Sequence, residues 1–284
     1  MTGVERAVLI TGASTGIGEA CALHLDRLGF TVFAGVRKEA DGRELQAKAS
    51  PRLTPLSLDV TDQGQVTAAV HAIEGGLGTA GLWGLVNNAG IAVGGPLEFL
   101  PVDEFRRQLE VNVVGQLRVT QAFLPLVRRA RGRIVNMSSV SGRLAAPFMG
   151  PYSSSKFALE AISDALRLEL KPWGIMVSVI EPSNVATPIW EKSLRAGMAV
   201  MERLPSRARE LYGPVIARMP EVVRASARSG VSPELVARAV AHALTARHPR
   251  TRYRVGRGAA LAVAFGRMAP DRVRDWAIGR RLRA

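Results

Sequence analysis

The stretch AVLITGASTGIG, residues 7–18, decides the fold. Its first four residues are all apolar and predict a strand buried on both faces of a sheet. The glycine spacing G-x-x-x-G-x-G follows, and an Ala- and Leu-rich stretch after it predicts a helix. Because glycines let the backbone turn sharply and a helix start offers free N–H groups, a pyrophosphate can bind there. This order predicts a dinucleotide site, with a tight packing turn as the alternative. The predicted contacts are Gly12, Ser14, Thr15, Gly16, Ile17 and Gly18.

Short apolar runs alternate with longer helical patterns along the rest of the chain. This alternation predicts βαβ units and therefore a parallel sheet with helices on both faces. We expect the α/β class and a Rossmann-type, doubly wound sheet of about seven strands. The predicted strands are Ala7–Ile10, Thr31–Val36, Leu53–Leu58, Gly84–Val86, Arg133–Met137, Met176–Ile180 and Tyr253–Val255.

The chain of 284 residues fits one α/β domain, and nothing in its middle reads as a linker. We expect a single domain over residues 1–284. A long, irregular helical pattern interrupts the rhythm at about 188–232, and we expect an insertion over the ligand-binding edge of the sheet. A peripheral helical pair is the alternative. A basic extension is expected at about 250–284.

The formal net charge is +14, and from Arg247 onward eleven arginines accompany only two acids, Asp271 and Asp275. Such a surface attracts anionic lipid or nucleic acid, and an arginine-rich solvated face is the alternative. Aromatic side chains that stack on bases are scarce, so nucleic acid is not expected as a partner. Peripheral contact with a membrane stays open.

The single cysteine, Cys21, cannot form an internal disulfide, and the four histidines do not cluster. No metal site is therefore expected. The sequence reaches its first strand at Ala7 without a charged and then apolar leader, and no apolar stretch approaches the roughly 20 residues that span a bilayer. We expect a cytoplasmic protein.

Four further motifs follow in order near predicted strand ends and helix starts: LDV at 58–60, NNAG at 87–90, NMSS at 136–139 and YSSSK at 152–156. Asn112 lies within a helical pattern between them. With the glycine turn, this set resembles the short-chain dehydrogenase/reductase family. The resemblance runs from about Ala7 to Pro188, and more loosely to the end. In pattern the chain is most similar to the branch that includes retinol and hydroxysteroid dehydrogenases.

The spacing of Tyr152 and Lys156 carries chemistry of its own. The two residues are four apart, so on a helix they share a face. A tyrosine hydroxyl titrates near pH 10, and the Lys156 ammonium, helped by the positive charge of nicotinamide, is expected to lower that pKa. Ser139, at a strand end, can hydrogen-bond the substrate oxygen. The resemblance implies that Asn112 holds a water linking Lys156 to solvent. The alternatives are a core or surface tyrosine and a solvated asparagine.

The resemblance also implies contacts to a dinucleotide. Asp59 resembles the adenine contact of the family, although a turn cap is the alternative. Lys156 beside Tyr152 is expected to hold ribose hydroxyls. Ser183 stands where the family usually has glycine, which puts the backbone path over the nicotinamide in doubt. The implied contacts are Asp59, Val60, Asn88, Ala89, Gly90, Tyr152, Lys156, Pro182, Val185 and Thr187.

Residues at the end of the second predicted strand indicate which cofactor is preferred. An NAD site needs an acid there to bind the ribose 2′-hydroxyl, and by the resemblance that position is Val36. Arg37 occupies the place where NADP-using members carry arginine, and a guanidinium binds a phosphate through paired N–H donors. NADP(H) is therefore expected, with NAD(H) as the alternative. A merely solvated Arg37 is the other interpretation.

The expected substrate is a sterol-, retinoid- or lipid-like alcohol or ketone. The segments expected to enclose it are Gly94–Leu97, Leu144–Met149 and the insertion from Ile189, although such clusters are often core. The residues expected to line it are Leu144, Pro147, Phe148, Met149, Trp190, Met198 and Met201. A homo-oligomer, dimer or tetramer, is expected. The alternative function is a catalytically silent, cofactor-binding regulatory protein that associates with a membrane or nucleic acid.

Overall fold

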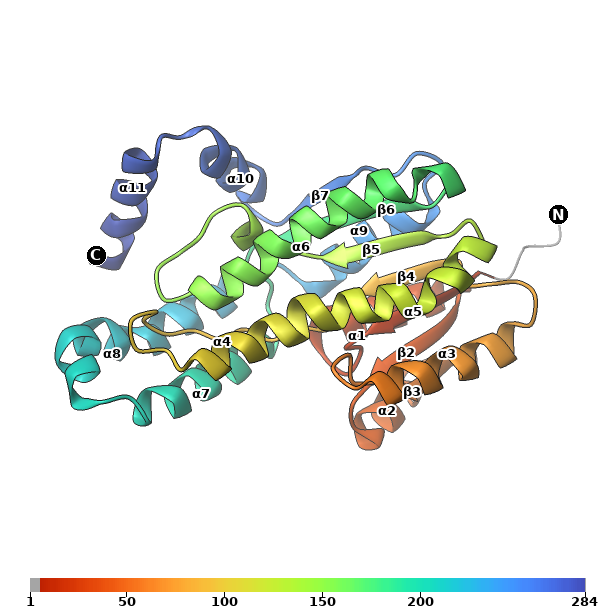
Figure 1. Ribbon diagram of the computed structural model, residues 1–284, viewed down its shortest axis with the longest axis horizontal. Helices are drawn as coiled ribbons and strands as arrows, with labels where there is room; N and C mark the ends of the chain where they lie inside the picture. The colour runs from red at the N-terminus through yellow and green to blue at the C-terminus, as the bar shows by residue number, and fades with distance from the viewer. Residues whose placement is uncertain (1–5, 284) are drawn as a thin grey trace.

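A seven-stranded parallel sheet forms the centre of the computed structural model, which describes residues 6–283 (Figure 1). The strand order is β3-β2-β1-β4-β5-β6-β7, so the chain runs outward from β1 in both directions. This confirms the predicted doubly wound sheet. The strands are β1 (Ala7–Thr11), β2 (Thr31–Val36), β3 (Leu53–Ser57), β4 (Gly84–Asn87), β5 (Arg133–Met137), β6 (Met176–Pro182) and β7 (Arg252–Val255).

Five strand ends differ from the sequence prediction. β1 ends at Thr11, β4 ends at Asn87 and β7 begins at Arg252, which makes each of them one residue longer than predicted. β3 ends at Ser57, one residue before the predicted Leu58. β6 continues to Pro182, two residues beyond the predicted Ile180, because Glu181 and Pro182 still pair with β7. The longer β6 carries its last residues to the edge of the sheet where the site lies.

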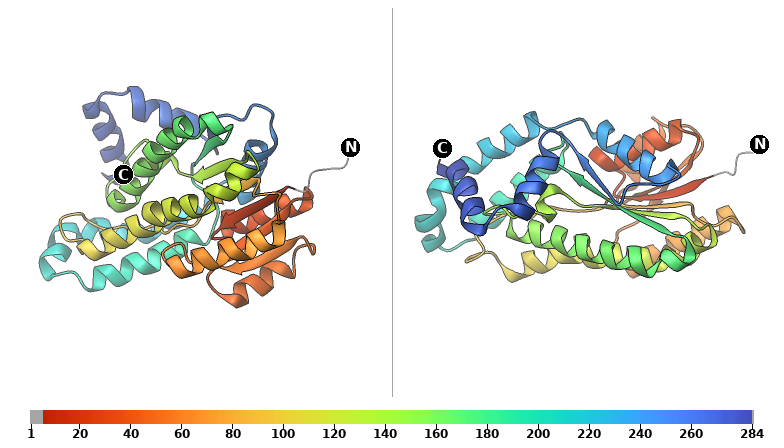
Figure 2. Two further views of the ribbon diagram at one scale, coloured as in Figure 1. Left: turned by 45° about the vertical axis from the view of Figure 1, so that its right-hand side comes forward. Right: turned by 90° about the horizontal axis from the view of Figure 1, so that it is seen from above.

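Helices cover both faces of the sheet, and each face has its own apolar core (Figure 2). On one face, α1 packs against α9, and Cys21 of α1 is fully buried there. On the other face, α3 and α5 bury residues such as Ile73 and Phe123. The bounds are α1 (Gly16–Arg27), α2 (Glu39–Gln46), α3 (Gln63–Leu77), α4 (Val102–Leu109), α5 (Gly115–Arg129), α6 (Gly150–Glu169) and α9 (Pro233–Thr245).

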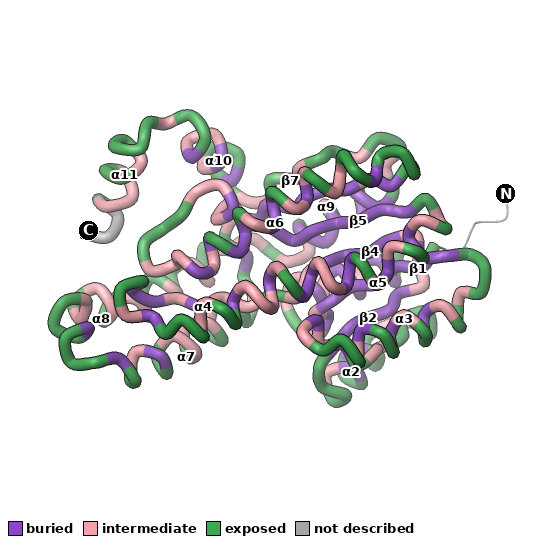
Figure 3. The backbone as a smooth tube through the Cα atoms, viewed as in Figure 1, coloured by how far each residue is buried: buried purple, intermediate pink, exposed green. Residues whose placement is uncertain are grey.

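The segment expected to be an insertion forms two helices, α7 (Ile189–Glu202) and α8 (Ser206–Arg228). They lie beyond the carboxyl ends of the strands, beside α4 (Figures 1 and 2). Most of their surface is exposed, in contrast to the buried strands (Figure 3). A separate apolar cluster joins Val200, Leu204 and Ala208 to Val93 and Leu100 of the chain after β4.

The C-terminal part of the chain adds the last strand to the sheet and then forms two helices. β7 pairs with β6, and then α10 (Ala259–Met268) and α11 (Asp271–Arg283) follow at one end of the molecule (Figure 1). α10 contacts β7 and the turn at Val140–Gly142. Within residues 6–283, no helix is long and apolar enough to cross a membrane.

Candidate active site

The glycine turn has a backbone that only glycine adopts readily. Gly12 and Gly16 have φ values of 65° and 64°, in the left-handed region. Gly18 has no room for a side chain, because a Cβ there would lie 2.2 Å from the Gly12 carbonyl oxygen. At the start of α1, the side chain of Thr15 makes no capping hydrogen bond, so the first N–H groups of the helix stay available to a ligand. These features fit a pyrophosphate.

Asn88 holds this turn closed. Its side-chain amide donates to the carbonyl oxygens of Thr11 and Gly12, each over 3.0 Å. In return, the hydroxyl of Thr11 accepts from the backbone N–H groups of Asn88 and Ala89, each over 3.0 Å. The NNAG segment, which ends at Gly90, is therefore bound to the glycine turn. The predicted ribose contact of this segment stays a prediction.

Asp59 caps a turn. Its Oδ1 accepts from the backbone N–H and the hydroxyl of Thr61, over 2.9 and 2.7 Å. This is the alternative that the sequence left open, and it fixes the carboxylate just after β3, beside buried Val60. The adenine contacts expected of Asp59 and Val60 stay predictions. Arg37 lies at the end of β2 with an exposed side chain, whereas Val36 before it is buried.

Ser139, Tyr152 and Lys156 come together at the carboxyl ends of β5 and β6. Lys156 Nζ lies 5.6 Å from the centroid of the Tyr152 ring and donates to the Met137 carbonyl oxygen over 2.7 Å. Ser139 Oγ lies 3.5 Å from the Pro182 carbonyl oxygen and accepts from the Ser141 N–H over 3.1 Å. The four-residue spacing therefore places tyrosine and lysine on one face of α6, as predicted.

Burial shifts the pKa values of both Tyr152 and Lys156. Burial raises the pKa of Tyr152, and the hydrogen bond to Ser139 lowers it by less. Burial lowers the pKa of Lys156 to about 8, against the opposing charge of Glu160. In the protein alone burial is the largest effect on the pKa of Tyr152, and the lowering expected from Lys156 together with a nicotinamide stays a prediction. Tyr152 carries its proton at neutral pH and can give it to a substrate oxygen.

Asn112 lies in a π-helical turn, Glu110–Val114, that interrupts the run from α4 to α5. Such turns are frequent at functional sites. Its amide donates to the Ile91 carbonyl oxygen over 3.0 Å and to Ser155 Oγ over 3.1 Å. Ser155 Oγ donates to the Tyr152 carbonyl oxygen over 2.7 Å. Asn112 thus contacts the backbone of α6 through Ser155, and the relay toward Lys156 stays a prediction.

Gln108 is a functional candidate that the sequence analysis missed. It is fully buried, donates to the Ile91 carbonyl oxygen over 2.9 Å and accepts from the Val93 N–H over 2.7 Å. Asn112 contacts the same Ile91 backbone. The spacing of four residues between Gln108 and Asn112 places both amides on one helical face, and this signal was available in the sequence.

Two buried carboxylates next to the site were also missed. Glu160 on α6 and Glu181 at the end of β6 are 3% and 0% exposed. Arg143, in the loop after Ser139, bridges them over 2.5 and 3.1 Å. Arg252 on β7 pairs with the same two carboxylates over 3.2 and 3.4 Å. Because buried carboxylates need such partners to stay charged, the cluster fixes the Ser139 loop against α6 and β6.

Ser183, the departure from the family glycine, is accommodated by a glycine elsewhere. Gly256 has a φ of 109°, which favours glycine, and a Cβ there would lie 2.1 Å from Ser183 Oγ. The Ser183 N–H donates to the Val255 carbonyl oxygen over 2.8 Å. On the same loop, Val185 forms a bridge with Val231, and Thr187 packs against Gly16. Thr187 therefore lies beside the glycine turn.

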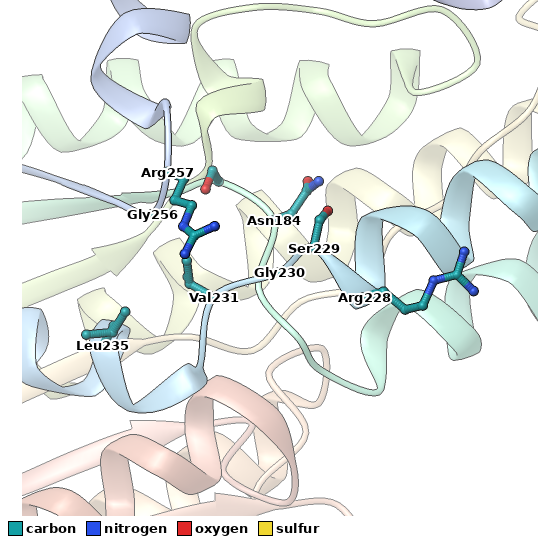
Figure 4. Close-up of a pocket in the computed structure, with 9 residues that line it drawn as sticks. Asn184, Arg228, Ser229, Gly230, Val231, Leu235, Gly256 and Arg257 are labelled. Atoms are coloured by element: carbon teal, nitrogen blue, oxygen red, sulfur yellow. The ribbon is translucent and has the colours of Figure 1, made fainter.

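A cavity of about 950 Å³ adjoins this loop (Figure 4). Ser183, Asn184 and Gly230 are among the residues that line it. Arg257 extends toward Val231, whereas Arg228 points away from the other lining residues (Figure 4). The cavity shares Ser183 with the loop that follows β6, at the end of the sheet where the site lies.

The segments expected to enclose the substrate also meet. The Gly95 N–H donates to the Phe148 carbonyl oxygen over 2.8 Å, and the Phe148 ring meets Tyr212 of α8 edge-on at 6.0 Å. Met201 packs into the apolar cluster beside Gly95, and Leu144 packs against Gly266 of α10. Met201 and Leu144 thus make packing contacts, as in the alternative interpretation that these residues belong to the core.

Residues 6–197 match the family model described as short chain dehydrogenase. The chain therefore belongs to the short-chain dehydrogenase/reductase family and is an NAD(P)-dependent dehydrogenase/reductase. It is 43% identical to retinol dehydrogenase 5 of Mus musculus over 277 residues, which are 95% of this chain and 87% of the relative. The predicted retinol and hydroxysteroid dehydrogenase branch is confirmed.

Two further likenesses bear on substrate and cofactor. The chain is 44% identical to the mitochondrial D-beta-hydroxybutyrate dehydrogenase of Bos taurus over 265 residues, covering 88% of this chain and 76% of the relative. A short chain dehydrogenase from Burkholderia cenocepacia J2315, solved in complex with NADP, is 25% identical and superimposes with a TM-score of 0.72. That likeness covers 99% of both chains.

Proposed function

We propose that this enzyme prefers NADP(H) and interconverts a carbonyl and a secondary or primary alcohol on a hydrophobic, sterol-, retinoid- or lipid-like substrate. The observation that carries the cofactor preference is Arg37. Its side chain is exposed at the end of β2 and has no ion-pair partner among residues 6–283, and the neighbouring Val36 cannot serve as the acid of an NAD site. NAD(H) is the alternative cofactor.

The geometry of the site supports a role for each of four residues. A bound nicotinamide supplies or accepts the hydride. Tyr152, whose pKa is raised by burial, gives its proton to the carbonyl oxygen during reduction. Ser139 hydrogen-bonds the same oxygen, and the Lys156 ammonium holds the ribose and restores the proton. Asn112 keeps the backbone of the catalytic helix in place through Ser155.

The substrate class is supported by the apolar and aromatic residues around the site. Phe148, two residues before α6, contacts Tyr212 of α8 edge-on, and Phe99 contacts the same Tyr212 ring edge-on at 6.0 Å. Such surroundings favour a large apolar molecule over a small acid. The named relatives include a retinol dehydrogenase and a hydroxybutyrate dehydrogenase at similar identity, so identity alone does not choose between the two classes.

A turnover screen with the purified full chain tests this proposal. NADPH absorbance is followed with retinal, a ketosteroid, a long-chain aliphatic ketone and acetoacetate. A higher kcat/KM for the apolar carbonyls supports the proposed class. A higher kcat/KM for acetoacetate would overturn the substrate class and leave the oxidoreductase activity intact.

The remaining proposals concern assembly and location. We propose a homo-oligomer, dimer or tetramer, and a single domain with α7 and α8 as its substrate-loop insertion. The basic C-terminal helices are proposed to contact another subunit or an anionic membrane surface, because exposed Leu261, Met268 and Trp276 accompany their arginines. The expected cytoplasmic location stays a prediction, since one named relative is mitochondrial.

A further inference from the structure

Helix α7 brings a cation to the glycine turn. Lys192, in the first turn of α7, donates from Nζ to the Thr15 hydroxyl over 3.3 Å. Thr15 is the N-cap residue of α1. The two residues lie 177 positions apart, so this contact joins the insertion to the start of the dinucleotide turn.

Packing of the chain before α7 supports this position. A Cβ built on Gly16 would lie 3.1 Å from both Cβ and Cγ2 of Thr187, so the loop already rests on the turn. The Lys192 N–H donates to the Pro188 carbonyl oxygen over 3.0 Å, which makes the chain helical immediately after this contact. The ammonium therefore reaches the N-terminus of α1 from a short, anchored segment.

No acid neutralises the Lys192 ammonium among the described residues. Glu19, in the first turn of α1, pairs instead with Lys48 over 2.7 Å. The N-terminus of α1 is itself positive, because its first N–H groups lack partners within the helix. Two positive groups that face each other across the turn repel one another, and an anion between them would relieve that repulsion.

We propose that Lys192 binds the pyrophosphate of the dinucleotide from the side of the insertion, so that cofactor binding holds α7 over the active site. This inference rests on the proposed dinucleotide site at Gly12–Gly18. The 2′-phosphate belongs at the other end of the cofactor, beside Arg37 at the end of β2. Lys192 therefore acts on NADPH and NADH alike.

The proposal is tested by measuring the Kd of four proteins for NADPH and for NADH by titration calorimetry. The proteins are the wild type, Lys192→Ala, Lys192→Arg and the matched control Arg195→Ala, which removes an exposed cation one turn further along α7. Lys192→Ala should raise both Kd values by a similar factor, about tenfold for the loss of one charge-assisted hydrogen bond. Lys192→Arg should restore most of the affinity, and Arg195→Ala should bind as the wild type does.

A second readout follows the helix itself. NADPH should slow amide hydrogen exchange over residues 189–202 in the wild type and much less in Lys192→Ala. Unchanged Kd values in Lys192→Ala would overturn the proposal. A loss of affinity confined to NADPH would also overturn it, because it would indicate that Lys192 binds the 2′-phosphate. If the wild type binds neither dinucleotide, the proposed function and this inference both fail. If the wild type binds and Lys192→Ala binds equally well, only this inference fails.

Discussion

Glu160 lies one turn beyond Lys156 on α6, and its carboxylate raises the pKa of the Lys156 ammonium while burial brings that pKa down to about 8. Both side chains are buried. The charge on Lys156 is therefore present below a pH of about 8 and is lost as the pH rises through that value. Since Lys156 is proposed to restore the proton of Tyr152, we expect the buried pair to set the alkaline limit of the proposed reduction.

We expect kcat/KM for carbonyl reduction to fall on the alkaline side with a midpoint near pH 8, the pKa of Lys156. Glu160→Gln should move this midpoint to lower pH, because it removes the carboxylate that favours the charged ammonium. Asp164→Asn is the matched control: it lies on the same helix and also pairs with Arg252. Its midpoint should stay at the wild-type value. A midpoint in Glu160→Gln that stays or rises contradicts this account.

Tyr152→Phe should lower kcat by at least about 100-fold, because it removes the hydroxyl that exchanges the proton and keeps the ring. The Kd for NADPH should stay close to the wild-type value, since Lys156 and the glycine turn remain. Steady-state rates and a binding titration measure the two quantities separately. Ser154→Ala, an exposed neighbour on α6, is the control. A Phe variant that retains more than about a tenth of the wild-type kcat would count against the role.

Local sequence patterns predicted most of the fold and part of the site. The strand at Arg133–Met137 has the predicted bounds, because a short apolar run between helical patterns decides it. Tyr152 and Lys156 share a face because helix geometry alone requires it. The positive φ of Gly12 and Gly16 follows equally from the local glycine spacing.

The features that the sequence did not reveal depend on contacts between distant segments. Arg143 and Glu181 are 38 positions apart, and each one alone reads as an exposed charge. A helical pattern does not separate the π-helical turn at Asn112 from an ordinary helix. The raised pKa of Tyr152 results from burial, which only the packed structure defines.

Residues 188–230 should slow their amide hydrogen exchange when cofactor and substrate bind together. This segment forms α7 and α8, which share one small apolar cluster with the chain after β4 and expose most of their surface. Pro214 and Pro220 lie inside α8 and remove two backbone donors. Helix α9, which packs against α1, serves as the internal control. Exchange that is equally slow in α7 and α8 with and without ligands would contradict this prediction that the segment closes over the site.

The C-terminal helices should bind anionic vesicles at low salt and release them at high salt, if they contact a membrane. Leu261 and Trp276 are 77% and 60% exposed, and arginines such as Arg272 accompany them. Electrostatic attraction is least screened at low ionic strength, so sedimentation with anionic vesicles at low salt is the most sensitive measurement. Neutral vesicles are the control. Absence of vesicle binding at low salt would exclude the proposed membrane contact and leave contact with another subunit as the role of these helices.

Val36→Asp combined with Arg37→Ala should shift the enzyme from NADP(H) toward NAD(H). In the wild type, buried Val36 ends β2 and exposed Arg37 follows it without an ion-pair partner among the described residues. The guanidinium binds a 2′-phosphate through paired N–H donors, whereas the new carboxylate would accept from a 2′-hydroxyl and repel a phosphate. Arg43→Ala, an exposed arginine of α2 that pairs with Glu39, is the control for a change in charge alone. Loss of the charge-assisted pair should reduce kcat/KM with NADPH by about tenfold or more, and the new aspartate should raise it with NADH. The ratio of the two kcat/KM values, measured with the same substrate, is the decisive quantity. A wild type that uses NADH as well as or better than NADPH would show that Arg37 does not select the cofactor.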